Sequence, residues 1–384
     1  MREDEEWRRY CAAPQESVEG NEVELLRGGE AAFPALLAAV RGARKYVLLE
    51  FYSFADDSAG RSFAALLREK VRAGVEVRLV YDSIGSILTD RRFFLELAAA
   101  GVKVAEFRPV IYWKPYWNWI KRDHRKTVSV DGACSFVGGF NITESDAPRS
   151  MGGRGWTDTL VKVSGPAVAD VERLFWESWS ASTMVAGGYE PPLPLPAPDP
   201  AGDKRALVVS AGGIRNVRSI RRSYRHAIDQ AERYIYITNA YFLPDRQVLR
   251  RLTEAAGRGV DVRIIAPRET DHPYVRWASW AIFGRLLERG VKVYEWQGSI
   301  LHSKTAVIDG VWSSVGSHNL DHRSLQYNLE MNINVYDRDF GSEMARAFRE
   351  DLKNSKAVTL AAVRSRPLTA KAASRVLYFL RSWL

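Results

Sequence analysis

The sequence predicts an α/β protein of two homologous halves, each a mostly buried mixed β-sheet flanked by helices, which dock with pseudo-twofold symmetry. Three observations lead to this prediction: an eighteen-residue pattern occurs twice, the segments before each copy also match, and a proline-rich stretch separates the copies. Helical segments alternate with nearly continuous apolar runs in both copies, which is typical of a sheet covered on both faces.

The segments upstream of the pattern show the duplication first. Each half has a helical segment, a β-rich run, a second helix, a second strand and a third helix that ends in GVKV. The first half supplies FPALLAAVRGA, ARKYVLLEFYSF and AGVEVRLVYDS, and the second supplies IRRSYRHAIDQA, AERYIYITNAYF and RGVDVRIIAP. We therefore expect the same order of strands and helices in both halves.

The repeated pattern itself is HRKTVSVDGACSFVGGFN, which begins at His124, and HSKTAVIDGVWSSVGSHN, which begins at His302. The two stretches align without a gap and share nine of eighteen residues. Each holds an Asp-Gly pair between two β-rich runs, which is a strong hairpin signal. We therefore expect Asp131 and Asp309 to fix two turns, and each histidine to lie at the entry to a strand.

Changes in composition suggest where the halves begin and end. The prolines of GYEPPLPLPAPDPAGDK favour an extended connector rather than a strand. The expected segments are a charged tail over 1–20, a first half over 21–187, a linker over 188–204, a second half over 205–355 and an amphipathic C-terminal helical segment over 356–384. The apolar face of this last segment either completes a core or lies in a lipid interface.

Charge and composition limit the class of partner and the compartment. A formal net charge of +9 favours an anionic partner, either nucleic acid or an acidic membrane surface. Two cysteines far apart do not suggest a disulfide scaffold. No apolar run approaches the roughly 20 residues of a membrane span, and the start MREDEEWRRY does not resemble a signal peptide. We expect the chain to stay on the cytoplasmic side, where its charge suits either nucleic acid or, for a peripheral protein, the face of the membrane.

Each copy of the pattern carries a histidine, a lysine and an asparagine, and docking of the halves would bring both sets to one cleft. These candidate site residues are His124, Lys126, Asn141, His302, Lys304 and Asn319. Ammonium and carboxamide groups suit phosphate oxygens. A neutral histidine can attack phosphorus while a protonated one releases the leaving alkoxide, so the set predicts a phosphodiester substrate and a phosphohistidine, without metal or cofactor.

The paired H-x-K-x-x-x-x-D motifs resemble those of the phospholipase D superfamily. More narrowly, the chain is similar to bacterial cardiolipin synthases from about residue 20 to residue 350. The strings that carry this similarity are GNEVELLRGGEAAF, LLEFYSFADDSAG, GVEVRLVYDSIGS, DHRKTVSVDG, VGGFNI, WTDTLVKVSGPAV, NAYFLPD and HSKTAVIDG.

This resemblance implies transfer of a phosphatidyl group to phosphatidylglycerol at a membrane surface, with glycerol or another head group leaving. It makes His124 the nucleophile and His302 the acid and later base, and it assigns carboxylates that orient the two imidazoles to Glu330 and Asp158. The donor lipid, either phosphatidylglycerol or phosphatidylethanolamine, and the oligomeric state stay open. The alternative function is a phosphodiesterase that hydrolyses phospholipid or nucleic acid. A nuclease of the same superfamily, however, would not be expected to carry the strings shared with cardiolipin synthases.

Differences between the copies suggest further roles. Ser317 replaces a glycine of the first copy, so only the second copy can offer a hydroxyl to the phosphate. The distance from GVKV to the motif is 23 positions in the first half and 12 in the second, an insertion of 11 residues. Its Trp113, Trp117 and Trp119 either dock on a membrane or fill the interface between halves. A metal site at His318 and His322 is disfavoured, because no further ligand lies at suitable spacing.

Overall fold

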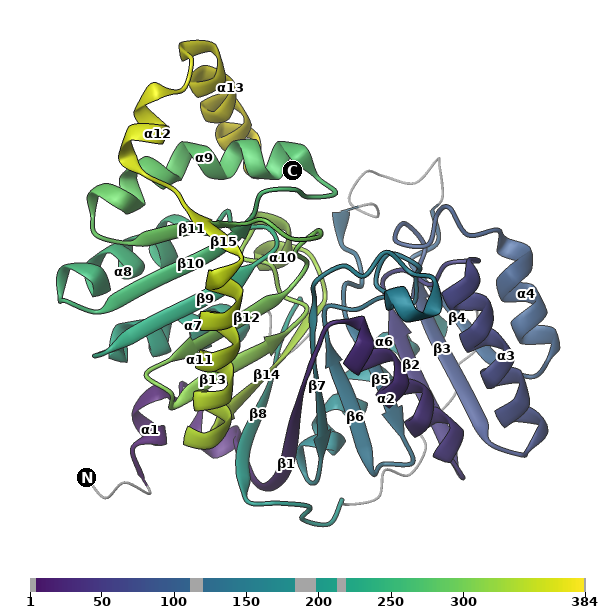
Figure 1. Cartoon of the computed structure of the whole chain (residues 1–384). Coiled ribbons are helices and arrows are strands. Elements are labelled where there is room, and N and C mark those ends of the chain that lie inside the picture. The colour runs from purple at the N-terminus through teal and green to yellow at the C-terminus, as the bar shows by residue number, and fades with distance from the viewer. Residues whose placement is uncertain (1–4, 111–119, 184–197, 213–218, 383–384) are drawn as a thin grey trace.

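The chain folds around one continuous fifteen-stranded mixed sheet with helices on both faces (Figure 1). The computed structural model describes residues 5–110, 120–183, 198–212 and 219–382. Within these ranges, the predicted α/β class and the division into two similarly built halves are confirmed. The insertion residues Trp113, Trp117 and Trp119 lie outside the described residues, so their predicted docking role stays a prediction.

The first half contributes seven strands and the second contributes eight. The strands of the first half are β1 (Val18–Arg27), β2 (Tyr46–Phe51), β3 (Glu76–Asp82), β4 (Lys103–Phe107), β5 (Lys126–Val130), β6 (Cys134–Gly138) and β7 (Thr159–Ser164). Those of the second half are β8 (Lys204–Ala211), β9 (Tyr234–Asn239), β10 (Asp261–Pro267), β11 (Lys292–Trp296), β12 (Lys304–Ile308), β13 (Trp312–Gly316), β14 (Glu330–Tyr336) and β15 (Ser355–Ala357).

The helices follow the same repeat. Those of the first half are α2 (Gly29–Gly42), α3 (Ser58–Arg72), α4 (Arg91–Ala99) and α6 (Ala167–Thr183). Those of the second half are α7 (Ser219–Gln230), α8 (Arg246–Gly257), α9 (Pro273–Glu288), the short α10 (His322–Gln326) and α11 (Arg338–Lys353). The chain starts with α1 (Trp7–Tyr10), and α12 (Leu360–Ser365) and α13 (Leu368–Phe379) follow β15.

The strand order shows the twofold relation of the halves. From one edge to the other it is β15-β11-β10-β9-β12-β13-β14-β8-β1-β7-β6-β5-β2-β3-β4. Antiparallel β1 and β8 join the halves at the centre, where Val18 pairs with Ala206 and Asn21 with Lys204. One apolar cluster continues across this junction, with residues of α6 and β7 against residues of β14 and α11. The two halves are therefore one packed body rather than two domains on a flexible linker.

The two Asp-Gly turns form the predicted hairpins β5-β6 and β12-β13. Asp131 and Asp309 adopt the left-handed conformation, with φ of 56° and 55°. The Asp309 carboxylate accepts backbone N–H bonds from residues 232 to 234 at 2.7–2.8 Å, and the buried Tyr10 hydroxyl donates to it at 2.7 Å. The Asp131 carboxylate accepts the equivalent bonds from residues 44 to 46. Both aspartates thus fix the hairpin to the start of the neighbouring strand.

The N-terminal residues are more than the charged tail predicted over 1–20. Helix α1 packs on α7, and Tyr10 lies in the apolar core of the second half. Strand β1 already begins at Val18, and β15 crosses the predicted start of the C-terminal segment. The remaining segment boundaries stay predictions.

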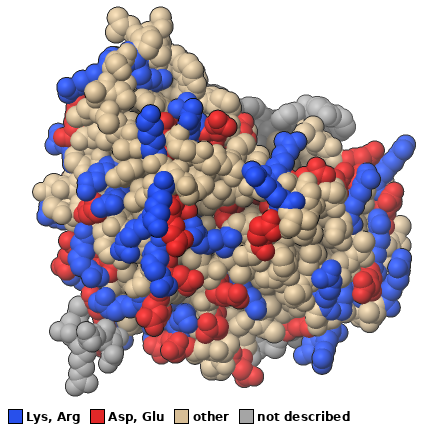
Figure 2. Space-filling model, in the orientation of Figure 1, with Lys and Arg blue, Asp and Glu red and all other residues tan. Residues whose placement is uncertain are grey.

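The C-terminal segment forms α12 and α13, which pack on α9 and project from the second half (Figure 1). Figure 2 shows that this end of the molecule carries mostly uncharged and basic residues on the face in view. Among the described helices, none combines the length and the apolarity that crossing a bilayer requires.

Replacing Asp309 with alanine should destabilise the fold by at least about 3 kcal/mol, because three backbone donors and a buried tyrosine hydroxyl lose their acceptor. Urea unfolding would measure the loss. Asp131→Ala is the matched control and should cost less, since among the described residues no tyrosine hydroxyl bonds to that carboxylate. Normal stability with lost turnover in Asp309→Ala would contradict the structural role.

Candidate active site

The two motif histidines are held in place by backbone bonds from the opposite half. The His124 amide donates to the Leu329 carbonyl at 2.9 Å, and the His302 amide donates to the Thr157 carbonyl at 2.7 Å. Both histidines are buried, with 8% and 4% of their surface exposed. Each lies two residues before the first strand of its hairpin, so the strand ends and the opposite half together fix its position.

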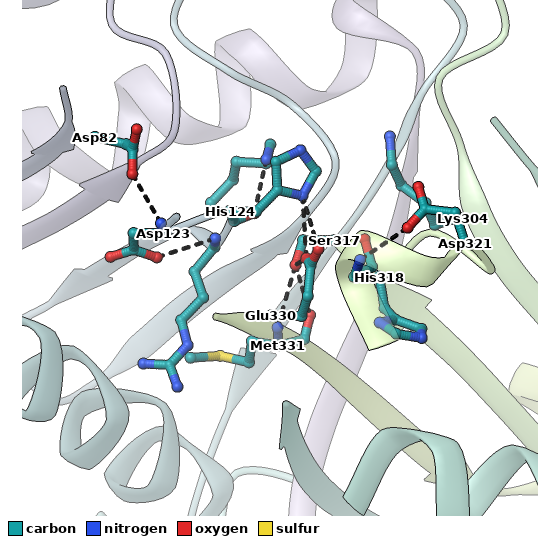
Figure 3. A network of polar contacts seen from close by, with 12 residues as sticks. Asp82, Asp123, His124, Lys304, Ser317, His318, Asp321, Glu330 and Met331 are labelled. Carbon is teal, nitrogen blue, oxygen red and sulfur yellow. Dashed lines mark hydrogen bonds and ion pairs between the residues drawn. The ribbon is translucent and has the colours of Figure 1, made fainter. Parts of the chain in front are cut away.

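The two histidines receive their carboxylates crosswise. His124 Nδ1 lies 3.0 and 3.1 Å from the two oxygens of Glu330, which begins β14 of the second half (Figure 3). His302 Nδ1 lies 2.7 Å from Asp158 Oδ2 of the first half. A carboxylate on Nδ1 fixes the ring and directs Nε2 outward. The structure therefore places each of the two carboxylates that the resemblance assigned beside a histidine of the other half, and neither half has a complete pair alone.

The two motif lysines lie beside the histidines. Lys126 Nζ donates to the His124 carbonyl at 2.7 Å, and Lys304 Nζ donates to the His302 carbonyl. Burial lowers the pKa of Lys126 to about 7, and burial lowers the pKa of Lys304 as well. A phosphate anion between them would favour the charged form of both, because opposite charge opposes the cost of desolvation.

The two motif asparagines are both buried, but they differ in their partners. Asn141 Oδ1 accepts from the Ser53 amide at 3.2 Å, which leaves its NH₂ group as the donor for a ligand. Within the described part of the chain, Asn319 Oδ1 has no hydrogen-bond partner. Such an unsatisfied buried amide oxygen is costly, which is typical of a site that binds a ligand.

Ser317 does not take the phosphate-facing position predicted for it. Its hydroxyl donates to Glu330 Oε2 and accepts from the Met331 amide at 3.1 Å (Figure 3). It therefore holds the carboxylate that contacts His124. The equivalent Gly139 leaves room for the other carboxylate, since a Cβ there would lie 2.2 Å from Asp158.

Sequence reasoning missed Asp146, a third buried carboxylate. Single side-chain atoms of Asp146, Asp158 and His302 lie within 4.8 Å of one another. Burial and the charge of Asp158 raise the pKa of Asp146 to about 7, and burial raises that of Asp158 to about 7. Such a group could hold a cation, but the Lys304 ammonium already acts on both carboxylates and lowers the pKa of each. Comparing the motif copies would have singled Asp146 out, because the second copy has Ser324 there.

The charged groups that act on the two histidines differ. Burial lowers the pKa of both imidazoles. Around His124, the charges of both motif lysines and of Arg323 act in the same direction. Around His302, Lys304 also lowers the pKa, but Asp271 opposes it. Asp271, which accepts from the Tyr241 hydroxyl at 2.7 Å, was not predicted from the sequence.

The first half also carries a buried charge network that the second half lacks. Asp82 accepts from the Asp123 amide at 2.8 Å, and Asp82 lies 3.5 Å from the Arg122 guanidinium. Arg125 lies 3.7 Å from Glu50. In the second half the positions equivalent to Glu50, Asp82, Arg122, Asp123 and Arg125 hold Thr238, Pro267, Ile300, Leu301 and Ser303. The ion pairs around β5, which follows His124, therefore have no counterpart among these equivalent residues around β12, because all five of them are uncharged.

Comparisons with known proteins show the family to which the chain belongs. A family model described as cardiolipin synthase, PLD-like domain, matches residues 36–179 and 224–352. The cardiolipin synthase of Geobacillus kaustophilus is 34% identical over 93% of this chain and 71% of its own length. The major cardiolipin synthase of Bacillus subtilis is 32% identical over 91% of this chain and 73% of its own length.

Two solved structures share the fold. The phosphatidylserine synthase of Haemophilus influenzae superposes with a TM-score of 0.72 at 13% identity, over 94% of this chain and 95% of that one. The polyphosphate kinase of Porphyromonas gingivalis superposes with a TM-score of 0.61 at 16% identity, over 94% of this chain and 54% of that one. At these identities the two structures support the fold only.

Replacing Asp146 with asparagine should stabilise the protein at alkaline pH. The unfolded chain ionises this carboxyl near pH 3.8, whereas the folded protein keeps the proton to about pH 7. Wild-type stability therefore falls as pH rises between these values, and asparagine removes that loss. Thermal melting from about pH 5 to about pH 8 should show a variant advantage that grows with pH.

Asp203→Asn, at a side chain that is 94% exposed, is the matched control and should show no such trend. An Asp146→Asn advantage that is constant or shrinks with rising pH would contradict a raised pKa at this carboxyl.

Proposed function

Because the chain belongs to the phospholipase D-like family of cardiolipin synthases, we propose that it transfers a phosphatidyl group to phosphatidylglycerol through a phosphohistidine. The observation that carries this proposal is the crossed pairing of two histidines with two carboxylates beside two lysines. This arrangement offers a nucleophile, an acid and an anion clamp in one buried place. The reaction forms cardiolipin and releases glycerol when phosphatidylglycerol is also the donor.

In the first step His124 attacks the phosphorus of the donor lipid through Nε2. The bond from phosphorus to the head-group oxygen breaks, and His302 gives its Nε2 proton to that oxygen. Lys126, Lys304 and the asparagine amides bind the phosphoryl oxygens, whose charge must be stabilised in the transition state. Glu330 stabilises the positive ring of the phosphohistidine.

In the second step His302, now neutral, takes the proton of an acceptor hydroxyl. The oxygen attacks phosphorus, the bond to His124 breaks, and both histidines return to their starting states. Water as the acceptor would give phosphatidic acid, so the balance between transfer and hydrolysis depends on which hydroxyl enters the site.

The different charges around the two histidines support this division of labour. His124 has Glu330 as its carboxylate and lies among cations, which favour the neutral ring that a nucleophile needs. His302 has Asp158 at 2.7 Å, and the charge of Asp271 opposes the lowering of its pKa, so its surroundings favour the protonated ring that an acid needs more than those of His124 do. The bound phosphodiester would act in the same direction at His302.

Single replacement of either histidine by alanine should lower turnover by at least about 10³-fold, and the double variant should lose little more, because the two residues act as a unit. The assay is incubation with phosphatidylglycerol alone, followed by mass analysis for cardiolipin, glycerol and phosphatidic acid. His226→Ala is the matched control, since His226 bonds only to the Arg9 carbonyl among described contacts of its ring.

Phosphatidic acid without cardiolipin would make the enzyme a hydrolase instead. Phosphate trapped on His302 rather than on His124 would reverse the two roles.

A further inference from the structure

Exposed large apolar side chains gather at two places on the described surface. Nine such residues are exposed in total, and seven of them belong to these two places. The first place is the loop after β3, with Ile87 and Leu88. The second place is the outer surface of α13 and the neighbouring α9, with Trp277, Leu368, Val376, Phe379 and Leu380. Leu88 is 99% exposed and Phe379 is 79% exposed, so neither has a partner in the core.

Helix α13, which carries the second of these places on its outer surface, packs close to the active site through its inner surface. Its inner residues Leu377 and Tyr378 pack on the cluster that contains Tyr241, and the Tyr241 ring lies 6.3 Å from the His302 ring. The turn after α13 contacts α10, which begins three residues beyond Asn319. The apolar face predicted from the sequence, with Val376 and Phe379, points to solvent while the helix packs through other residues.

The loop after β3 lies at the same edge of the sheet in the other half. Its Ile84 and Gly85 amides donate to Asp82 Oδ1, and the other oxygen of Asp82 accepts from the Asp123 amide, next to His124. Since β3 runs parallel to β2, both strands end at the edge where His124 enters β5. Two apolar tips therefore flank the edge that carries the active site, one from each half.

The charge of the C-terminal segment distinguishes between the possible partners of these two apolar tips. Residues 357–384 contain five basic residues and no acidic residue. The basic residues are Arg364, Arg366, Lys371, Arg375 and Arg381. A second copy of the chain, packed face to face, would bring these cations against one another. An anionic lipid surface would instead attract them, at about 1 kcal/mol for each residue near the surface.

We propose that the Ile87–Leu88 loop and the outer surface of α13 insert together into an anionic bilayer, with the active-site edge turned toward the lipid head groups. The identity of the lipid substrate in this inference rests on the proposed function. The placement of the two apolar tips beside the active site does not depend on it. Apolar side chains with basic flanks are typical of helices that lie in the membrane interface. With both tips inserted, a lipid head group reaches the histidines without leaving the membrane surface.

The experiment uses the full chain and compares three variants. One carries Val376→Ser with Phe379→Ser, the second carries Ile87→Ser with Leu88→Ser, and the control carries Leu95→Ser. Leu95 lies on α4 and is 58% exposed, so it matches the replaced residues in exposure but lies outside both tips. Sedimentation with vesicles of phosphatidylglycerol and phosphatidylcholine measures binding, and vesicles of phosphatidylcholine alone show the part due to charge.

Each double variant should bind the anionic vesicles at least about tenfold more weakly, whereas the control should stay within about twofold of wild type. Turnover of vesicle phosphatidylglycerol should fall in parallel. Turnover of a soluble short-chain phosphatidylglycerol and the melting temperature should not change, because all four replaced side chains are more than half exposed.

Unchanged vesicle binding in either double variant would overturn the role of that tip. A wild-type dimer in light scattering that becomes monomeric in the α13 variant would identify the surface as a contact between copies instead. If the wild type turns over neither substrate, the proposed function fails, while sedimentation still decides whether the tips bind lipid.

Discussion

The crossed contact between each histidine and a carboxylate of the other half is the constraint on which the rest of the structure depends. A contact of 2.7 Å tolerates little relative movement, so the two halves must keep a fixed position. The continuous sheet through β1 and β8, the shared apolar cluster and the backbone bonds of both histidines provide that rigidity. Rigid strands are better supports for such a site than loops, because they hold side chains within fractions of an ångström.

The site also concentrates charge where water cannot screen it. Lys126, Lys304, Asp158 and Glu330 are each at most 1% exposed. Burying charged groups is expensive, and these groups offset one another only in part, as the opposite pKa changes of the lysines and carboxylates show. The apolar clusters of both halves must supply the missing stability. A bound phosphodiester would favour the charged forms of the two lysines, because its negative charge opposes the effect of their burial.

Much of this architecture follows from the sequence, because a duplication and a hairpin signal are local patterns. The order of strands, the turns at Asp131 and Asp309 and the grouping of the motif residues could be predicted in this way. Glu330 and Asp158 needed the family resemblance, since nothing in their own segments says which histidine they contact. Asp146 and Asp271 were missed because loops bring them to the site, and the position of a loop depends on tertiary packing. Tyr10 was missed because its partner, Asp309, lies 299 residues away.

The covalent joining of two copies has a consequence for how such a site can evolve. A symmetric dimer of one half would present two identical histidines, and any change near one would also occur near the other. In a single chain the copies mutate independently, so Gly139 and Asp146 can accompany Asp158 while Ser317 and Ser324 occur in the other copy. Symmetry in the backbone is kept while symmetry in the electrostatic field is broken. Fusion thereby turns two equivalent groups into a pair whose members can specialise.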